Sequence, residues 1–315
     1  MACIAALGWA CRSDASSAPA PPELAEQHLG LPEPVPETGS RRQIPPELRI
    51  FFTEEGFQRM GKPLPRDWLA TQTELGQTFP NFGRSHPNRP DELRQILYLL
   101  PLGELGPHDP SVEVLADFTR RYFTLPVEIL PMVEPETVGA TTRTNRQTLR
   151  PQILAPDVLT WMRKRVPDDA YAVIAVTDED LYPEESWNYV FGLGSFRDRV
   201  GVYSFARYDP AFYGDDLGED EARRLILHRA IKVMAHEIGH MFGIEHCIYF
   251  ECVMNGANHM EEADSRPMHL CPIELRKLWD SVGFDIRARY KSLSEFYAAH
   301  GFPADAAWTR MRAEL

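Results

Sequence analysis

The stretch MAHEIGHMFGIEHC, residues 234–247, constrains the fold of this chain more than any other segment, and it holds three of the ten histidines in 315 residues. Apolar residues recur here at spacings of three and four, which predicts a helix with one core-facing stripe: Leu227, Ile231, Met234, Ile238 and Met241. The acidic residues 219–221 suit the start of this helix, because its dipole favours negative charge there. Gly243 suits its end, since glycine readily takes the left-handed conformation that reverses the chain.

The histidine spacing predicts a metal site. His236 and His240 are one helical turn apart and therefore share a face of the helix. A reversal of the chain at Gly243 brings His246 back towards the same point. Two imidazoles from a rigid helix and a third from the following turn leave one position of a tetrahedral zinc ion open for water. The pattern therefore indicates a catalytic zinc ion.

Glu237 supplies the remaining chemistry. It lies about 100° around the helix from His236, so it is close to the metal without being a ligand. Zinc lowers the pKa of its bound water towards neutrality, and a nearby carboxylate then takes the proton as general base. Requiring Gly243 and His246 beside the HExxH pattern makes chance matches rarer by roughly 500-fold. We expect hydrolysis by a zinc-bound water that Glu237 activates.

The segments before this helix alternate between strand-like and helix-like patterns. Strands are expected at 94–105, 126–133, 170–177, 187–196 and 199–208, and helices at 109–123 and 155–166. This alternation implies a sheet with crossover helices packed on it. Residues 187–194, WNYVFGLG, are a candidate edge strand that aligns an extended peptide by main-chain hydrogen bonds.

The composition excludes several classes of protein. Acidic residues outnumber basic ones by 46 to 33, for a formal net charge of −13, so an electrostatic grip on nucleic acid or anionic lipid is not expected. No run of about 18 apolar residues is present to span a membrane. Five cysteines do not make a disulfide scaffold in a chain of this length. Three of them follow the histidines closely, at Cys247, Cys252 and Cys271, which favours metal thiolates.

Residues 1–46 do not have the composition of a folded segment. Eight prolines lie between Pro19 and Pro46, which predicts an extended, disordered leader. The apolar run that ends at Cys11 has no Lys or Arg before it, unlike an export signal, so we expect a cytoplasmic protein. The alternative is export or lipid attachment through Cys11, because a cysteine followed by a Ser/Ala/Pro tether is a feature of lipid-anchored bacterial signals.

The metal-binding stretch resembles the archaemetzincins, a branch of the metzincin zinc metallopeptidases. Their pattern is HExxHxxGxxHC, four residues, CxM, a spacer and CxxC. HEIGHMFGIEHC (236–247), IYFECVM (248–254) and Cys271 match it, and 180–208 is similar to the family's region before the active-site helix. The resemblance implies a metzincin-like α/β (α+β) fold with a mixed twisted sheet, backing and active-site helices, a small mainly helical C-terminal subdomain, and a cleft between them.

The resemblance also divides the chain beyond the leader, 47–315, as a single catalytic domain. It implies an N-terminal extension (47–89), an upper subdomain with the active-site helix (90–243), and a lower subdomain with the Met-turn and the cysteine cluster (244–315). Met254 is the implied Met-turn residue, packed beneath the zinc-binding histidines. We expect a monomer that acts on a peptide or protein substrate.

A second, closed zinc site is implied as well, and here the sequence departs from the family pattern. Three thiolates are in place, but Glu274 occupies the last position of CxxC. Carboxylate oxygen also binds zinc, so Glu274 is our preferred fourth ligand beside Cys247, Cys252 and Cys271. His269 is a less well-placed alternative, and the third possibility is that no stable second zinc binds. We expect one catalytic zinc ion and a second, structural one.

Two other functions are compatible with these residues. A gluzincin-type zinc hydrolase would use a downstream glutamate, Glu261 or Glu262, as third ligand and would leave His246 idle. A catalytically silent, zinc-stabilised binding protein would have no purpose for Glu237. A metallopeptidase uses all of these residues and is therefore the preferred interpretation.

Overall fold

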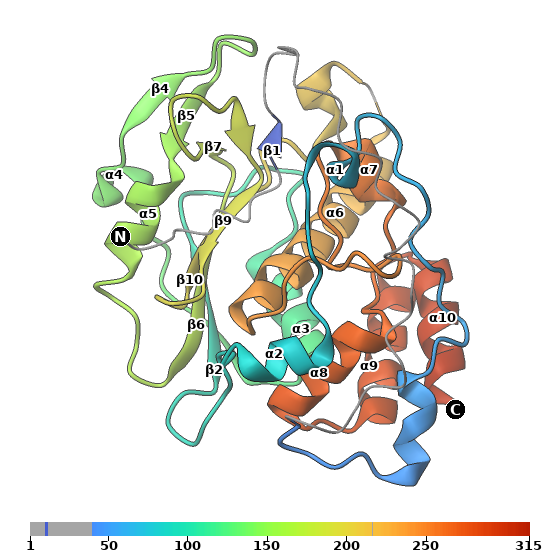
Figure 1. Ribbon diagram of the computed structural model, residues 1–315. Helices are drawn as coiled ribbons and strands as arrows, with labels where there is room; N and C mark the ends of the chain where they lie inside the picture. The colour runs from blue at the N-terminus through green and yellow to red at the C-terminus, as the bar shows by residue number, and fades with distance from the viewer. Residues whose placement is uncertain (1–9, 12–39, 216) are drawn as a thin grey trace.

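The computed structural model describes residues 10–11, 40–215 and 217–315. Of the expected leader, 1–9 and 12–39 lie outside the described residues. The strands occupy one side of the molecule, the C-terminal helices occupy the other, and the long helix α6 (Glu219–Met241) runs between them (Figure 1). None of the described helices is long and apolar enough to cross a membrane.

The main sheet has five strands with helices on both faces. In spatial order they are β3 (Val127–Ile129), β2 (Ile96–Pro101), β6 (Ala170–Thr177), β10 (Val200–Ser204) and β9 (Gly192–Ser195). The first four are parallel, and β9 runs antiparallel to β10 at the edge. Every residue of β6 is buried, as expected of a central strand covered on both sides. The mixed sheet with crossover helices is therefore confirmed.

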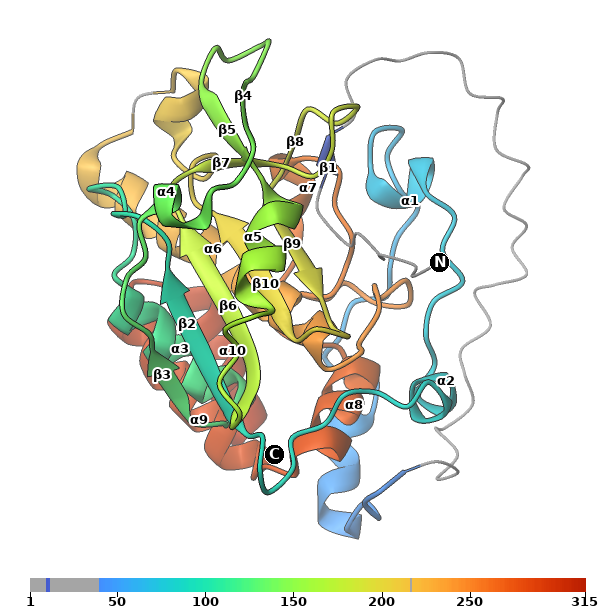
Figure 2. The same ribbon diagram turned by 90° about the vertical axis from the view of Figure 1, so that its left-hand side faces the viewer.

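Alternate residues of β2 and β6 face two different cores. Helix α3 (Val112–Phe123) and α6 cover one face, and helix α5 (Ala155–Met162) covers the other, which is turned to the viewer in Figure 2. The strand residues on the α3 and α6 side are Leu97, Leu99, Ile174 and Val176. Those on the α5 side are Tyr98, Leu100, Val173 and Ala175. Because side chains alternate along each strand, one sheet thus contributes to both cores, and α6 packs on the same face as α3.

A second sheet of short strands was not expected from the sequence. It consists of β1 (Ala10–Cys11), β8 (Tyr189–Val190), β7 (Asp180–Tyr182), β5 (Pro151–Leu154) and β4 (Thr142–Thr144). The expectation of one strand at 187–196 is wrong in this respect, because β8 pairs with β7 whereas β9 pairs with β10. The chain changes sheets at Phe191, whose carbonyl accepts a hydrogen bond from the Ser204 amide. Strands of two to four residues are too short to give a recognisable period.

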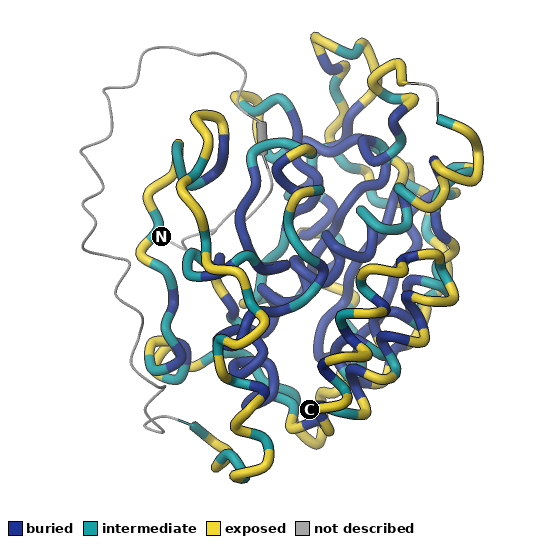
Figure 3. The backbone as a smooth tube through the Cα atoms, turned by 90° about the vertical axis from the view of Figure 1, so that its right-hand side faces the viewer, coloured by how far each residue is buried: buried dark blue, intermediate teal, exposed yellow. Residues whose placement is uncertain are grey.

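The remaining elements are helices from the N-terminal and C-terminal parts of the chain, and some of them pack against one another. The C-terminal helices are α7 (Met260–Ser265), α8 (Pro272–Val282), α9 (Ile286–Ala299) and α10 (Pro303–Ala313). The N-terminal extension contributes the 3-10 helix η2 (Pro46–Phe52), α1 (Trp68–Thr71) and α2 (Phe79–Arg84), and η2 and α2 contact α8. The short elements α4 (Pro135–Val138) and η3 (Pro210–Tyr213) lie in connections. Helices α9 and α10 alternate buried and exposed residues, so one face of each packs inward, whereas α8 is buried along nearly its whole length (Figure 3).

Residues 40–46 were expected in the disordered leader, but the structure packs part of this segment against α8. The Asp280 carboxylate, fully buried, accepts hydrogen bonds from the Ser40 hydroxyl (2.8 Å) and from the amides of Arg41 (2.9 Å) and Arg42 (3.2 Å). The guanidinium of Arg89 also pairs with it at 2.7 Å. One carboxylate therefore holds two distant segments on α8, which moves the start of the packed chain before residue 47.

Asp280→Ala should lower the free energy of unfolding by about 2–3 kcal/mol. This is less than the roughly 3–5 kcal/mol for breaking a fully buried pair, because Arg89 keeps some contact with solvent. Trypsin should cleave after Arg41 and Arg42 in the variant and spare these sites in the parent. The exposed Asp168→Ala serves as control. Equal cleavage in parent and variant would contradict the role of Asp280.

Candidate zinc centre

Helix α6 carries the first half of the site in its last turns. His236, Glu237 and His240 are all buried there. The helix ends at Met241, and Gly243 then takes a φ of +76°, the left-handed conformation that the sequence predicted. The reversed chain leads to His246, which is buried beside the two helical histidines.

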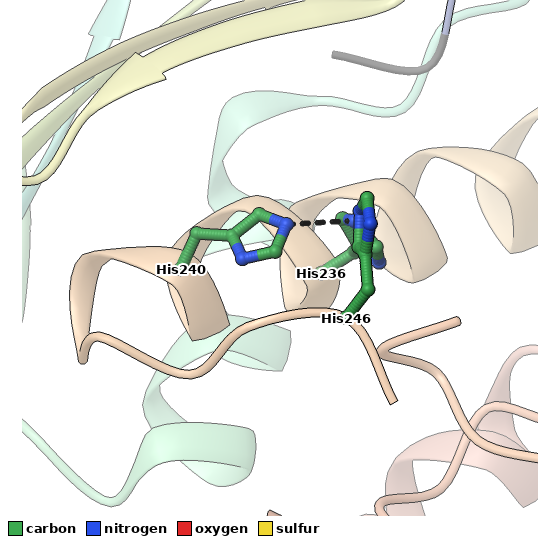
Figure 4. A group of neighbouring side chains, drawn as sticks. All are labelled: His236, His240 and His246. Atoms are coloured by element: carbon green, nitrogen blue, oxygen red, sulfur yellow. Dashed lines mark hydrogen bonds between the residues drawn. The ribbon is translucent and has the colours of Figure 1, made fainter. Parts of the chain in front are cut away.

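The three histidines converge on one point (Figure 4). Nε2 of His240 lies 2.9 Å from Nε2 of His236. The ring of His246 is centred 5.2 Å from that of His236 and 5.1 Å from that of His240. Each residue offers one ring nitrogen such that all three nitrogens lie within 4.8 Å of one another. The structure thus brings together the three residues that the sequence proposed as zinc ligands.

The other nitrogen of each ring faces an oxygen that fixes its proton. The acceptors of the three Nδ1 atoms are Val253 O at 2.8 Å for His236, Ile244 O at 2.6 Å for His240 and Glu74 Oε1 at 2.6 Å for His246. A carbonyl or carboxylate oxygen only accepts, so each Nδ1 donates and each Nε2 is the unprotonated nitrogen of its ring. Burial lowers the pKa of His236 well below its ordinary value and that of His240 to about 3, so both rings are neutral.

These features fit a zinc ion. Zinc binds neutral imidazole, and ligand histidines typically donate their second N–H to a carbonyl or carboxylate. Nε2 of His246 is buried and has no hydrogen-bond partner among the described residues, which leaves it available to a metal. The donor set, the fixed tautomers and the buried free nitrogen therefore all agree with zinc.

Glu237 is buried beside this cluster without belonging to it. Its carboxyl carbon lies next to the edge strand, since a Cβ placed on Gly192 of β9 would be 3.5 Å from it. Burial raises the pKa of Glu237 to about 8, and its Oε1 has no hydrogen-bond partner within the described part of the chain. A buried carboxylate with a free oxygen has the environment of a general base.

Met254 packs against helix α6 at Gly239, a residue that lies between His236 and His240 in the sequence. Gly239 has so little room that a Cβ there would be 2.5 Å from Met254 Sδ. The carbonyl of Met254 accepts a hydrogen bond from the Cys247 amide at 2.8 Å, which joins this loop to the turn behind His246. Met254 therefore lies where the family resemblance places the Met-turn residue.

The three clustered cysteines form a second candidate site. Cys247, Cys252 and Cys271 are buried, unbridged, and have their sulfurs within 4.8 Å of one another. Burial raises the pKa of the Cys252 and Cys271 thiols well above the ordinary value. Burial acts on Cys247 in the same sense, but hydrogen bonds from the other two thiols outweigh it and lower its pKa. Three buried sulfurs that lie this close together are a site that a soft cation would complete.

Glu274 lies beside this cluster in an ion pair. Its carboxylate is fully buried and 2.7 Å from Nζ of Lys277, which is also fully buried. Burial raises the pKa of Glu274 to about 8, although Lys277 opposes the shift. Among the described residues, the atoms that lie within 4.8 Å of one another here are the three sulfurs alone. The ring of His269, the alternative ligand, is stacked on Trp308 with centroids 3.8 Å apart.

The downstream glutamates serve other purposes. The Glu262 carboxylate accepts hydrogen bonds from the backbone amides of Trp68 (3.0 Å) and Asn258 (2.8 Å). Glu261 is exposed. Within the described ranges, the cluster around His236 and His240 contains His246 and no glutamate. The gluzincin arrangement therefore has no support in the geometry.

Sequence reasoning missed the residues of the N-terminal extension that contact the site. Glu74, 172 residues before His246, accepts hydrogen bonds from His246 Nδ1 and, at 2.8 Å, from Trp68 Nε1. Burial by itself raises the pKa of Glu74, but the hydrogen bonds that it accepts from His246 and Trp68 outweigh this effect and lower the pKa. Glu74 belongs to no periodic pattern, so nothing in the local sequence pointed to it.

A three-histidine cluster with a buried glutamate on the same helix is the arrangement of a zinc-dependent metallopeptidase. Comparison with known proteins agrees. Residues 114–279 match the model of Peptidase family M54. Archaemetzincin-2 of Homo sapiens is 38% identical over 257 residues, which cover 73% of this chain and 71% of that protein. Archaemetzincin-1 of Homo sapiens is 32% identical over 254 residues, covering 72% and 51%.

A solved structure, the archaemetzincin of Methanopyrus kandleri, matches with a TM-score of 0.43 and 25% identity over 60% of this chain and 96% of that one. The family rests on the sequence matches. The chain belongs to peptidase family M54, the archaemetzincins, and is a zinc metallopeptidase.

Proposed function

We propose that this chain cleaves peptide bonds at a zinc ion held by His236, His240 and His246, with Glu237 as the general base. The observation that carries the proposal is the set of three Nδ1 hydrogen bonds, which turns the three Nε2 atoms towards one point. A structural histidine cluster would satisfy both nitrogens of each ring within the protein. Nε2 of His246 has no such partner among the described residues.

Zinc supplies a Lewis acid that makes water a nucleophile at neutral pH and polarises the substrate carbonyl. The chain's own residues do the rest. Glu237 accepts the proton of the attacking water and delivers it to the leaving amine. Burial favours the neutral form of Glu237, with a pKa of about 8, and a nearby cation stabilises the carboxylate that is needed as base. Glu237 is therefore a base only when its site also holds positive charge.

The edge strand β9 positions the substrate. It pairs with β10 on one side and has no strand partner on the other among the described residues. An extended peptide that adds to this free edge gains main-chain hydrogen bonds. Because Gly192 of β9 adjoins the Glu237 carboxyl group, the peptide backbone comes to lie within reach of the base.

Glu237→Ala should reduce hydrolysis of a peptide library by at least about 10²–10⁴-fold, the usual contribution of a general base. The variant should keep its zinc, because Glu237 is not a ligand. His240→Ala should lose both zinc and activity. Elemental analysis and peptide-cleavage rates measure these outcomes. Loss of zinc from Glu237→Ala would contradict the assigned roles, and a zinc-loaded parent that cleaves no peptide would favour the silent binding protein.

We also propose a second zinc ion at Cys247, Cys252 and Cys271, with Glu274 as fourth ligand. The supporting observation is that Glu274 is buried next to the thiols. Three thiolates and a carboxylate around one zinc ion leave a net charge of about −2, and the buried ammonium of Lys277 offsets part of it.

Elemental analysis should find about two zinc ions per chain as purified, with the second lost first to a chelator, because a carboxylate is a harder ligand than a thiolate. Glu274→Cys should slow this loss, and Glu274→Ala should accelerate it and lower the melting temperature. Lys277→Met is a matched test of the counter-charge and should weaken the second zinc without adding a ligand. A single zinc ion, with no effect of Glu274→Ala on metal content, would show that the second site is absent.

A further inference from the structure

The N-terminal segment Trp68–Gln77, which we call the clasp, lies against the turn that carries His246 although it falls outside the part that matches the family model. It begins with α1, which lies beside α7 (Figure 1), and the Trp68 amide is bound by the Glu262 carboxylate of α7. The indole of Trp68 also contacts the edge of the His246 ring, with centroids 5.2 Å apart. The clasp therefore contacts the third histidine directly.

Two polar side chains of the clasp form hydrogen bonds with this turn. The Glu74 carboxylate holds Nδ1 of His246 at 2.6 Å. The buried Gln77 amide donates to the Gly243 carbonyl at 3.0 Å and accepts from the Glu245 amide at 3.3 Å. The turn between the helical histidines and the third one is thus held at both ends by one segment.

Close backbone packing prevents the clasp from shifting. A Cβ on Gly76, which has a φ of +70°, would lie 2.7 Å from Ile248. A Cβ on Gly256 would lie 2.5 Å from the Trp68 indole. Lys277 also donates to the Gln77 carbonyl at 2.6 Å, which ties the end of the clasp to α8. Because the clasp is packed this closely, the Glu74 carboxylate is held in one position relative to the His246 ring.

We infer that the clasp completes the zinc site and that Glu74 is a positioning residue for its third ligand. His236 and His240 donate to neutral carbonyls, whereas His246 donates to a carboxylate. An anionic acceptor orients the ring and strengthens the electron pair on Nε2, so Glu74 compensates for the fact that His246 stands on a turn and not on a rigid helix. The inference rests on the proposed zinc-binding role of His246.

The test uses the full-length zinc protein with Glu74→Ala and Glu74→Gln. Zinc affinity is measured by competition with a chromogenic chelator, and melting temperatures are measured with and without zinc. Loss of such a partner typically weakens zinc binding about 10- to 100-fold. We expect this of Glu74→Ala, and a smaller loss in Glu74→Gln, whose amide oxygen still accepts the hydrogen bond without the charge. Leu75→Ala, at the 92% exposed neighbouring side chain, is the matched control.

The outcomes separate positioning from simple stabilisation. A positioning role predicts that Glu74→Ala lowers the melting temperature of the zinc-loaded protein more than that of the zinc-free protein, and that a cobalt-substituted variant has an altered visible spectrum. Equal losses in both forms with unchanged zinc affinity would overturn the inference. His246→Ala keeps the two proposals distinct. If it retains catalytic zinc, the proposed ligand set fails, and if it loses zinc while Glu74→Ala does not, only the inference about the clasp fails.

A separate observation concerns the substrate. A cavity of about 690 Å³ lies between the end of β9 and the turn after α6, lined by Phe196 on one side and Gly243–Glu245 on the other. Five arginines line it: Arg41, Arg89, Arg94, Arg197 and Arg199. Only two carboxylates do so, Asp91 and Glu245, which leaves an excess of three positive charges (5 − 2) in a chain of net charge −13. Positive charge is thus concentrated at one end of the proposed substrate strand.

The arginines of this cavity are only partly neutralised. Arg94 pairs with Asp91, and Arg89 pairs with Asp280. The side chains of Arg41 and Arg197 have no partner among the described residues and are exposed. Burial lowers the pKa of Arg89, and Arg41 and Arg42 lower it further, although the charge of Asp280 opposes them; burial and then Arg94 lower the pKa of Arg199. Neighbouring guanidinium groups that repel one another create a site for an anion.

The geometry points to a carboxylate of the peptide substrate as the group that this cavity takes. A peptide added to the free edge of β9 extends past the end of the strand into the cavity, where Arg197 follows Ser195 by two residues. Arginine binds carboxylates through two parallel hydrogen bonds. The carboxylate comes from an acidic side chain or from the peptide's C-terminus. This inference also rests on the proposed function, since it names the substrate class of the same site.

Matched peptides that differ only by Glu against Gln, each with a free or an amidated C-terminus, test this inference. We expect the Glu peptides to be cleaved with kcat/KM about fivefold higher, the range expected of an exposed ion pair, and Arg197→Glu to abolish this preference. Arg310→Glu, an exposed arginine far along α10, makes the same charge change and should leave it intact. A preference that follows the free C-terminus identifies the second source of the carboxylate.

Cleavage of all four peptides at equal rates would overturn the inference about the cavity while leaving the proposed function in place. Cleavage of none by the zinc-loaded parent would contradict the proposed function itself. Rising ionic strength should reduce the preference for Glu, because the ion pair is exposed to solvent.

Discussion

The three hydrogen bonds at Nδ1 of the histidines are the interactions on which the rest of this structure depends. Their acceptors come from three segments: the loop of Val253, the turn at Ile244 and the N-terminal extension with Glu74. A free imidazole exchanges its proton between two nitrogens and rotates about its side-chain bonds. A fixed acceptor removes both freedoms, so the Nε2 atoms converge before any ion arrives. The helix α6 alone sets the spacing of two histidines, but only the packing of all three segments turns three rings towards one point.

The buried charges of the molecule follow the same logic. An isolated buried carboxylate is expensive, and Glu237 has a raised pKa of about 8 with one oxygen unpartnered among the described residues. Elsewhere the chain pairs such groups, as with Asp180 and Arg207 at 2.7 Å, both nearly inaccessible to solvent. The contrast shows that this fold provides a partner for a buried carboxylate when that carboxylate has a structural role alone. Glu237 has one oxygen without a hydrogen-bond partner among the described residues, and a cation bound at the neighbouring histidines would stabilise its negative charge.

The part of the site that the sequence predicted is the part that local periodicity determines. Leu227, Ile231 and Met234 are spaced as on one face of a helix. Once this helix is predicted, the placement of His236 and His240 on a shared face follows without knowledge of the fold. The central strand 170–177 was expected with the bounds that the structure has, because a continuous apolar run is also a local signal. Tertiary pairing decides the rest. The split of 187–196 between two sheets depends on β7 and β10, and the contact of Glu74 with His246 spans 172 residues, so neither leaves a mark in its own neighbourhood.

These contacts also show which part of the chain the candidate site needs at its N-terminal side. The match to the family model begins at residue 114 and contains every proposed ligand. Yet residues 68–77 hold the turn at Gly243 and Glu245 and supply the acceptor of His246, and Glu262 and Lys277 hold those residues in place in return. Reciprocal contacts of this kind couple the docking of the N-terminal segment to the geometry of the metal site, since whatever stabilises one must stabilise the other. The proposed zinc centre therefore depends on contacts that begin at residue 68, and the HExxHxxGxxH motif is the part of it that the local sequence predicts.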